Sequence, residues 1–482
     1  MHYRIILRIL GILLMVFSIS MIPPAIVSHI YNDGVHAIFY LCLAITATTG
    51  FVFWLPAYNV KEELRTRDGF VVTVMFWLVL SIFGAIPFAL TEELNLSIVD
   101  AVFESMSGLT TTGATVITGI DDLPKSILFY RQQLQWLGGM GIIVLAVAIL
   151  PMLGIGGMQL YRAETPGPVK DSKLTPRITE TAKALWYIYA TLTVVCTLCY
   201  WLAGMSFFDA ITHSFSTVAI GGFSTHDESI GYFNSQLIEM ICVVFMLISA
   251  VNFGLHFFAW RRKSLSHYWQ DPEVKFFLST LTIIIVLATT LLLVSTSYEP
   301  AKAISDTVFM VVSIATTTGF ATTDFSSWPT VLPFMLLLTA FAGGCAGSTA
   351  GGMKIIRVLL IFKQGHREIK RLVHPNAVFS VKLSNKPISE KVLQAVWGFF
   401  SVYVGVFIIM LLAIMATGLD QITAWSAVAA TLNNLGPGLG EVSANYGSIN
   451  DTAKWILCFS MLLGRLEVFT LLILFTPIFW RR

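Results

Sequence analysis

Charged side chains are scarce in this chain of 482 residues. Lys, Arg, Asp and Glu make up only 12% of the sequence, whereas hydrophobic residues make up 56%. Ordinary soluble domains carry about 25% charged residues, because their surfaces face water. The composition therefore excludes an ordinary soluble protein and predicts one embedded in a lipid bilayer.

Motifs for nucleotide binding and catalysis are also absent. The sequence contains no GxGxxG, no GxxxxGK followed by Ser or Thr, no HExxH and no GxSxG, which are patterns that bind phosphates, hold a catalytic zinc or expose a serine nucleophile. We therefore expect no enzyme activity, no tightly bound cofactor and no nucleic acid partner. Nucleotides would act only through a partner subunit.

The six cysteines give no sign of a disulfide framework. All of them fall inside apolar stretches, including Cys196 and Cys199, which are spaced as CxxC. We interpret them as helix residues within the membrane and expect no zinc site.

Long apolar stretches recur along the chain. A helix crosses the hydrocarbon core of a bilayer with roughly 20 residues, so stretches of about that length predict membrane spans. The ten stretches are 5–27, 38–57, 70–90, 127–157, 184–204, 237–259, 276–295, 330–362, 393–416 and 455–479. The first follows Arg4 and Arg8 as a signal peptide would, but it is too long and lacks a cleavage site, so we interpret it as a retained helix.

The distribution of basic residues predicts the orientation. With ten spans and a cytoplasmic N-terminus, all but five of the 30 Lys and Arg residues fall on the cytoplasmic side. The five are Lys125, Arg131, Lys302, Lys454 and Arg465. Because cytoplasmic loops are enriched in basic residues, both termini are predicted to be cytoplasmic.

One short pattern occurs four times. The copies run from Asp100 to Gly113, from Asp209 to Gly222, from Asp306 to Gly319 and, with Thr in place of Asp, from Thr423 to Gly436, always over thirteen residues. Each copy is too short to cross a bilayer and lies between two full-length apolar stretches, so it must enter and turn back. We predict a short re-entrant helix, N-capped by the Asp or Thr, and then an extended glycine segment.

These units define the predicted fold. We expect an all-α membrane protein with four consecutive helix–pore loop–helix repeats around one pseudo-fourfold pore, plus two extra N-terminal transmembrane helices. The predicted boundaries are 1–60 for the two N-terminal helices, 69–160, 180–260, 272–363 and 392–482 for the repeats, and 364–391 for a basic cytoplasmic segment.

The glycine segments have the form of an ion filter. Irregular backbone at membrane depth must be buried or line a watery cavity, and a ring of backbone carbonyls can replace the hydration shell of K⁺. The predicted filter residues are Thr111, Thr112, Gly113, Ile220, Gly221, Gly222, Thr317, Thr318, Gly319, Asn434, Leu435 and Gly436. The alternative is that the glycines only allow close helix packing, which four copies in register disfavour.

A glycine-rich run interrupts the second apolar span of the third repeat. Residues 343–352 include five glycines and nothing larger than Cys or Thr, so a regular helix would be weak there. We predict an unwound intramembrane gate below the filter, with tight packing of small residues as the alternative. The candidate gate residues are Gly343, Gly344, Gly347, Ser348, Gly351 and Gly352, together with Arg465.

Three polar residues stand inside the predicted membrane region. Arg465 is costly at that depth, and it could bond carbonyls of the glycine run, set a barrier to cations, or pair with an acidic residue on another helix. Glu104 and His213 each precede a filter glycine by nine residues. We interpret them as polar groups that brace the filter from behind, with simple burial in a satisfied hydrogen bond as the alternative.

The most specific motifs resemble the Trk/Ktr/HKT superfamily of potassium transporters. They are SGLTTTGAT, AIGGFSTH, ATTTGF, LNNLGPGLG, GGCAGSTAGGMK and GRLEVFT, and the likeness covers essentially the whole chain. The resemblance implies a pseudo-tetrameric pore with K⁺ at the filter backbone carbonyls and an intramembrane gating loop at the glycine run. It also implies a homodimer in the bacterial inner membrane, gated by a cytosolic TrkA-type subunit that binds nucleotides.

Two details qualify what the resemblance implies. In the superfamily, a serine in place of the first filter glycine accompanies sodium preference, whereas all four filter glycines are present in this sequence. Ile220 and Asn434, however, stand where the other two segments have a filter Thr. We therefore expect potassium preference with looser selectivity. The basic stretch 354–391 is the largest surface for a regulatory subunit, and anchoring near anionic lipid is its alternative.

Two rival functions differ in what they require. A secondary transporter would couple potassium to H⁺ or Na⁺, and such proteins usually contain inverted repeats, whereas these four share one orientation. An intramembrane enzyme would need a nucleophile and a base, and the sequence contains no recognisable pair.

Overall fold

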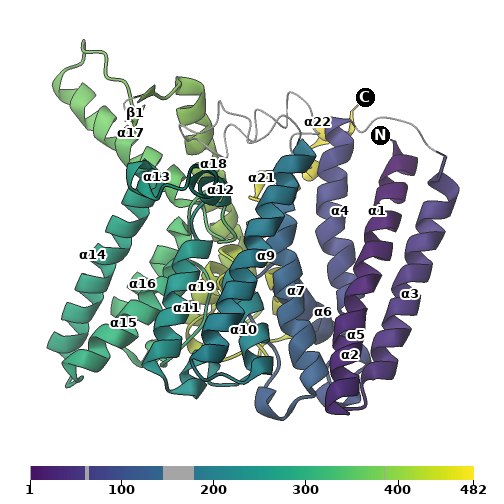
Figure 1. Cartoon of the computed structure of the whole chain (residues 1–482). Coiled ribbons are helices and arrows are strands. Elements are labelled where there is room, and N and C mark those ends of the chain that lie inside the picture. Colours follow the sequence, from purple (N-terminus) through teal and green to yellow (C-terminus); the bar gives the residue numbers. More distant parts are fainter. Residues whose placement is uncertain (1, 60–64, 145–177, 330, 385, 482) are drawn as a thin grey trace.

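The computed structural model describes residues 2–59, 65–144, 178–329, 331–384 and 386–481. These residues are almost entirely helical or in short connections (Figure 1), which confirms the predicted all-α class. The extended segments among them are β1 (Lys382–Leu383) and β2 (Lys386–Pro387), which pair antiparallel. The end of the first predicted repeat, 145–160, and residues 1, 60, 330, 385 and 482 of the other predicted units lie outside the described residues.

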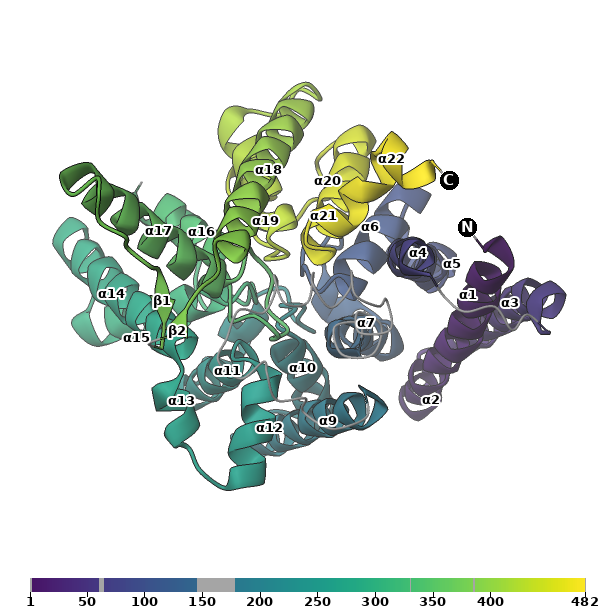
Figure 2. The same cartoon turned by 90° about the horizontal axis from the view of Figure 1, so that it is seen from above.

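The N-terminal helices form a hairpin that packs against the first group of the remaining helices. They are α1 (Tyr3–Ser18), η1 (Ile19–Met21), α2 (Ile22–Tyr31), α3 (His36–Trp54) and η2 (Leu55–Ala57). A Cβ on Gly11 would lie 2.6 Å from the Gly50 carbonyl oxygen, so these glycines let α1 and α3 pack closely. Figure 2 shows the hairpin at one side of the molecule, beside α4 and α7.

The rest of the chain supplies helices in four successive groups. The first contains α4 (Thr66–Gly84), α5 (Ile86–Leu90), η3 (Glu92–Leu94), α6 (Ile98–Leu109), η4 (Ile120–Asp122) and α7 (Lys125–Val144). The second contains α9 (Ile178–Leu202), α10 (Phe207–Ala219), η7 (Ser229–Phe233), α11 (Gln236–Ser249), α12 (Phe253–Arg262) and α13 (Ser266–Gln270). The third contains α14 (Pro272–Ser295), α15 (Pro300–Ala315), η8 (Phe325–Ser327), α16 (Val331–Ala342) and α17 (Ile355–Val373). The fourth contains α18 (Glu390–Met415), α19 (Gln421–Leu432), η9 (Gly440–Val442), α20 (Asp451–Arg465), α21 (Phe469–Leu472), η10 (Ile473–Phe475) and α22 (Pro477–Trp480).

Several of the predicted spans are broken helices. Within the described residues, six helices are long and apolar enough to cross a membrane, or eight if each bent pair is one span. The bends measure 93° between α11 and α12 and 109° between α20 and the segment Phe469–Phe475. The stretch 330–362 is divided between α16 and α17, and 127–157 extends beyond the described residues. Hydropathy alone does not register such breaks, which explains the difference from ten stretches.

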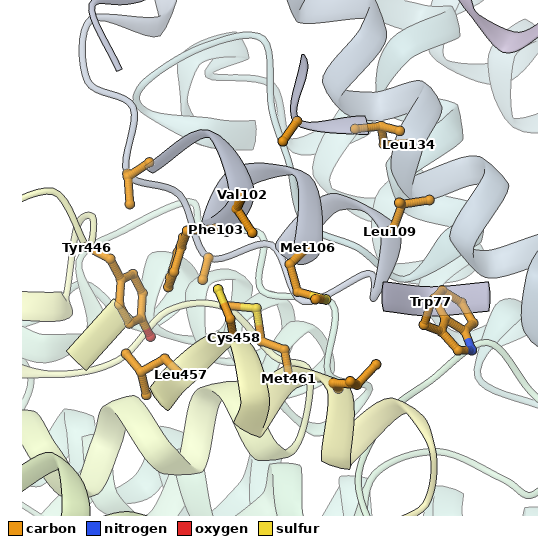
Figure 3. Close-up of a cluster of buried hydrophobic side chains, with 14 of the residues drawn as sticks. Trp77, Val102, Phe103, Met106, Leu109, Leu134, Tyr446, Leu457, Cys458 and Met461 are labelled. Carbon is orange, nitrogen blue, oxygen red and sulfur yellow. The ribbon is translucent and has the colours of Figure 1, made fainter. Parts of the chain in front are cut away.

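The short helix α6 is enclosed by the rest of the protein. Every residue from Ala101 to Leu109 is buried, as expected for a helix that contacts protein on all sides. In Figure 3, Phe103 and Met106 point towards Leu457 and Met461 of α20, and Leu134 of α7 lies near Leu109. The first and fourth groups of helices therefore share one core.

The N-caps of the short helices differ from the prediction. Ser97 caps α6, accepting from the Asp100 amide at 3.1 Å and donating to its carboxylate at 2.8 Å. Ser206 and Asp209 make the same pair of bonds at the start of α10. The predicted caps were therefore wrong by one turn, because a Ser three residues before the Asp lets each satisfy the other. Helix α15 begins earlier still, at Pro300, and Asp420 caps α19.

Candidate ion pathway

The four glycine segments adopt one backbone conformation. Each follows a short helix, and both the glycine and the residue two positions before it have positive φ angles. These angles are 52° at Thr111, 55° at Ile220, 65° at Thr317 and 53° at Asn434, with 81° at Gly113, 79° at Gly222, 86° at Gly319 and 100° at Gly436. A left-handed conformation costs a β-branched residue roughly 1–2 kcal/mol. The surrounding structure therefore imposes this shape at Thr111, Ile220 and Thr317, whereas Asn434 adopts it more readily.

The helix before each segment ends with the same hydrogen bond. The amide just before the glycine donates at 2.8 Å to the carbonyl oxygen five residues earlier in all four copies. The pairs are Thr112 to Ser107, Gly221 to Ser216, Thr318 to Ser313 and Leu435 to Ala430. This bond belongs to the Schellman motif, which stops a helix and reverses the chain.

Each glycine lies against the backbone of the next segment. A Cβ on Gly113 would collide with the carbonyl oxygen of Gly221, and the same holds from one segment to the next. An added Cβ would likewise meet the carbonyl oxygen of Thr318 from Gly222 and that of Leu435 from Gly319. From Gly436 it would lie 2.7 Å from the carbonyl oxygen of Thr112. The four segments therefore form a closed ring in chain order, and glycine is required because any Cβ would push two segments apart.

Polar side chains support the ring from its outer side. The hydroxyl oxygens of Thr110 and Thr112 lie 2.7 Å apart, and so do those of Thr316 and Thr318. The Tyr446 hydroxyl donates to the Gly436 carbonyl oxygen at 2.8 Å. Each of these groups is buried, so the bonds hold the segments without help from solvent.

Glu104 lies behind the first segment, in a buried network. Its carboxylate accepts from the Thr115 hydroxyl at 3.0 Å, from the Val116 amide at 3.1 Å and from Arg131 Nε at 2.8 Å. Arg131 also donates to the Ser224 carbonyl oxygen at 3.1 Å, in the chain after the second glycine. The ion pair is fully buried within the first group of helices, and the bond from Arg131 to Ser224 joins this group to the second.

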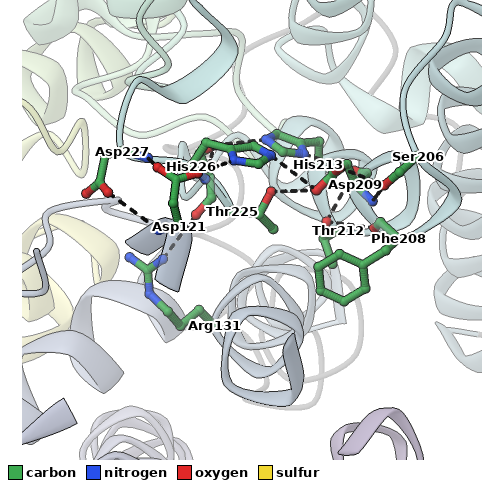
Figure 4. Close-up of polar contacts among 11 residues, drawn as sticks. Asp121, Arg131, Ser206, Phe208, Asp209, Thr212, His213, Thr225, His226 and Asp227 are labelled. Carbon is green, nitrogen blue, oxygen red and sulfur yellow. Dashed lines mark hydrogen bonds and ion pairs between the residues drawn. The ribbon is translucent and has the colours of Figure 1, made fainter. Parts of the chain in front are cut away.

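His213 has the corresponding place behind the second segment. Its Nδ1 donates to the Asp209 carbonyl oxygen at 2.9 Å, which leaves Nε2 to accept from the Ser224 hydroxyl, also at 2.9 Å. Figure 4 shows this imidazole between the start of α10 and the chain that follows the glycine. Glu104 and His213 are thus both buried and hydrogen-bonded to the chain that follows a ring glycine, at Thr115 and Val116 in the first case and at Ser224 in the second.

The glycine-rich run forms irregular backbone between α16 and α17. Gly343, Gly347 and Gly352 have positive φ angles, and a Cβ on Gly343 would collide with the Gly351 carbonyl oxygen. The Gly351 amide donates to the Thr317 hydroxyl at 2.7 Å, and the Gly352 amide donates to the Asn433 carbonyl oxygen at 3.2 Å. The run is therefore attached directly to the ends of the third and fourth short helices.

Other bonds fix the run to the second group of helices. The Thr349 hydroxyl donates to the Val218 carbonyl oxygen at 3.1 Å, and the Gly347 carbonyl oxygen accepts from the Phe253 amide at 3.0 Å. Ser348 bonds within the run, to the Cys345 carbonyl oxygen at 2.6 Å. Gly344 lies so close to Ala250 that a Cβ there would approach its carbonyl oxygen to 3.0 Å.

Arg465 reaches from α20 to this run. Its Nη2 donates to the Gly138 carbonyl oxygen of α7 at 2.9 Å, and its Nη1 donates to the Thr349 carbonyl oxygen at 3.4 Å. Among the described residues no carboxylate lies within ion-pair distance of it. Glu467, two residues on, pairs instead with Arg357 at 2.6 Å.

Comparison with known proteins identifies the family. The model of the TrkH family, described as cation transport proteins, matches residues 35–481. This chain belongs to the TrkH family. Proteins named "Trk system potassium uptake protein TrkH" are similar over the full length of both chains, with 62% identity in Halomonas elongata and 58% in Escherichia coli K12. The crystal structure titled as the potassium transporter TrkH from Vibrio parahaemolyticus is 55% identical, covers both chains completely and superposes with a TM-score of 0.93.

Three residues of this TrkH-family protein bond to the glycine segments or to the chain directly after them, and the sequence predicted none of them as a filter or gate residue. Gln135 and Arg131 of α7 bond to the second segment, and Tyr446 bonds to the fourth. No local motif marks these residues, because their partners are distant in sequence. Arg131 offered one signal, since it is one of the five basic residues that do not fall on the predicted cytoplasmic side and it lies inside a predicted span.

Proposed function

We propose that this protein takes up potassium across the bacterial inner membrane through a filter made of the four glycine segments. The closed ring carries the proposal, since four segments of one conformation bring their backbones together around one axis. The relatives named as potassium uptake proteins, which match the chain along its whole length, support potassium as the ion.

The proposed filter works through backbone carbonyls. Dehydrated K⁺ needs several oxygen ligands, and a ring of carbonyl dipoles supplies them without a fixed negative charge that would hold the ion too tightly. The short helices α6, α10, α15 and α19 end at the ring, so their C-terminal partial charges add a negative potential at the ion path. The filter residues are those at positions 111–113, 220–222, 317–319 and 434–436.

The glycine-rich run is proposed as the gate. Its amides bond to Thr317 and Asn433 beside the ring, and Arg465 holds its Thr349 carbonyl. A loop in this position obstructs the path while those bonds persist, and the guanidinium repels cations. Opening then requires the run to leave the ring, which its glycines permit because they adopt many backbone conformations.

The remaining parts of the proposal concern orientation and partners. Both termini lie at the end of the molecule that carries α17 and the β hairpin (Figure 1), and we propose that this end is cytoplasmic. Its basic segment 364–391 would receive a cytosolic nucleotide-binding subunit of the TrkA type, and the protein would act as a homodimer. The relatives' names, which refer to a Trk system, support a multi-component assembly.

Flux through purified protein in liposomes tests this function. With a potassium gradient and no partner protein, the account predicts uptake whose reversal potential follows the K⁺ gradient. A reversal potential that shifts with an H⁺ or Na⁺ gradient would favour coupled transport instead. Gly398→Ser is a suitable control, since Gly398 of α18 has open space around it.

A further inference from the structure

The second glycine segment lacks a side chain that two other segments have. Thr112 and Thr318 stand directly before their glycines, and each bonds through its hydroxyl to the Thr two residues earlier. The corresponding residue in the second segment is Gly221. This segment therefore needs support from another part of the chain.

Gln135 of α7 provides that support. Its Nε2 donates to the Gly221 carbonyl oxygen at 2.6 Å, and its Oε1 accepts from the Phe223 amide at 3.1 Å. The side chain is completely buried, and a Cβ on Gly221 would collide with its amide carbon. One amide group thus holds the backbone on both sides of the ring glycine Gly222.

A second residue of α7 acts on the same segment. Arg131, one helical turn before Gln135 and so on the same face, donates to the Ser224 carbonyl oxygen at 3.1 Å. Its guanidinium carbon lies 4.3 Å from the centre of the Phe223 ring. Helix α7 of the first group therefore holds the second segment at three successive points, Gly221, Phe223 and Ser224.

We propose that Gln135 is a positioning residue that sets the ion selectivity of the filter. The Gly221 carbonyl oxygen is one of the four that meet the neighbouring glycines, and the bond from Gln135 fixes its direction and draws electron density from it. An amide is suited to this task because it donates to a carbonyl and accepts from an N–H while remaining uncharged. The proposal rests on the proposed filter function and extends it to a residue of a different repeat.

Substitution of Gln135, measured as bi-ionic reversal potentials in liposomes, tests this proposal. Gln135→Met keeps the size of the side chain and removes both bonds. The sodium-to-potassium permeability ratio should rise about fivefold, the effect expected from losing the one bond that acts on the Gly221 carbonyl oxygen. Gln132→Met is the matched control, because Gln132 is a buried Gln of the same helix whose amide has no hydrogen-bond partner among the described residues. Its permeability ratio should equal that of the parent protein.

A second pair of variants separates positioning from folding. Gly221→Thr should be harmful alone because it collides with Gln135. The residue two positions earlier is Ala219, so the triple variant Ala219→Thr, Gly221→Thr and Gln135→Ala is the one that recreates the hydroxyl pairs of the first and third segments. The triple variant should recover most of the parent's permeability ratio, whereas Gly221→Thr alone should not, so the changes should be strongly non-additive.

The outcomes distinguish this proposal from the proposed function. Gln135 variants that lower thermal stability but leave the permeability ratio unchanged would show a structural role and overturn the proposal, with the filter itself unaffected. The same conclusion follows if every Gln135 variant fails to fold while Gln132→Met folds and conducts. If the parent protein carries no potassium current, the filter function itself is wrong.

Discussion

Asn434 donates a hydrogen bond to the Thr112 hydroxyl at 3.0 Å, although the two residues are 322 positions apart. The same amide nitrogen also donates to the Met461 carbonyl oxygen at 3.0 Å. The bond joins the fourth glycine segment to the first, where Gly436 also approaches the Thr112 carbonyl oxygen. The fourth glycine segment, the last along the chain, therefore contacts the first and closes the ring.

We expect Asn434→Ala to loosen the ring at this junction. The variant loses two buried hydrogen bonds, of which only the one to Thr112 acts on the filter. One bond contributes about 1 kcal/mol, so the sodium-to-potassium permeability ratio should rise about fivefold. Asn95→Ala is the control, since Asn95 also has a positive φ angle, of 46°, but lies after η3 and away from the ring. Equal permeability ratios in the two variants would mean that the bond to Thr112 has no part in selectivity.

The substitution Gly113→Ser should change which ions pass. A Cβ at this position collides with the Gly221 carbonyl oxygen, and overpacking of this kind costs typically 1–3 kcal/mol. The ring must distort, and the added hydroxyl suits a smaller ion, so sodium permeability should rise relative to potassium. Bi-ionic reversal potentials measure the ratio, with Gly398→Ser as the control. An unchanged ratio would remove Gly113 from the filter.

Changes at the gate should raise flux without altering ion preference. Arg465→Ala removes the bonds to Gly138 and Thr349, and shortening the run 343–352 removes the obstruction. Bonds from a charged group contribute about 1.5–3 kcal/mol, so basal potassium flux in liposomes should rise about tenfold or more. Because both changes act on one unit, their effects should be non-additive.

Arg465→Lys separates charge from hydrogen bonding at the gate. It keeps the positive charge but not the planar fork that reaches two carbonyls. Flux intermediate between the parent and Arg465→Ala is expected. If all these variants fold normally and leak no more than the parent, the run serves packing and not gating.

An ion pair beside the second segment should make stability depend on pH. His226 Nδ1 lies 2.5 Å from Asp121 Oδ1, and Nε2 lies 3.5 Å from Asp209 Oδ1 (Figure 4). Burial opposes the imidazolium charge, but the bonds to Asp209 and Asp121 outweigh it and raise the pKa of His226 above its usual 6.5. Burial likewise opposes the carboxylate of Asp121, and the bond from His226 outweighs it and lowers the pKa of Asp121 below 3.8.

The two pKa shifts determine how the stability of the protein changes with pH. The contribution of protonated His226 is fully present below pH 6.5 and is lost as the pH rises through its raised pKa. That of ionised Asp121 is present above pH 3.8 and is lost as the pH falls through its lowered pKa. The thermal stability advantage of the parent protein over His226→Gln should therefore shrink as the pH rises above 6.5. Parallel stability curves for the two proteins would contradict this assignment.

The sequence predicted local features of the site better than its contacts. The spacing of thirteen residues located four segments that share one conformation, because a glycine at positive φ after a short helix leaves a local signal. The starts of α6 and α10 were missed by one turn. Both Ser97 and Asp100, for example, are good capping residues, and only their reciprocal bonds decide between them.

Contacts between segments were beyond the reach of spacing and hydropathy. Gln135 and Gly221 are 86 positions apart, and no periodic pattern connects them. The partner of Glu104 is likewise on another helix, Arg131 of α7. Such pairs depend on how the groups of helices are arranged around the ring, which neither motif spacing nor apolar stretches specify.

The position of a bound ion tests the central claim most directly. In a structure determined in Rb⁺ or Tl⁺, heavy analogues of K⁺, anomalous scattering locates the ion without reference to the protein model. The account predicts a peak on the axis of the ring, among the backbone carbonyls of Thr112, Gly221, Thr318 and Leu435, and its loss in Gly113→Ser. A ring without any peak, with the ion held elsewhere by side-chain carboxylates, would contradict the account.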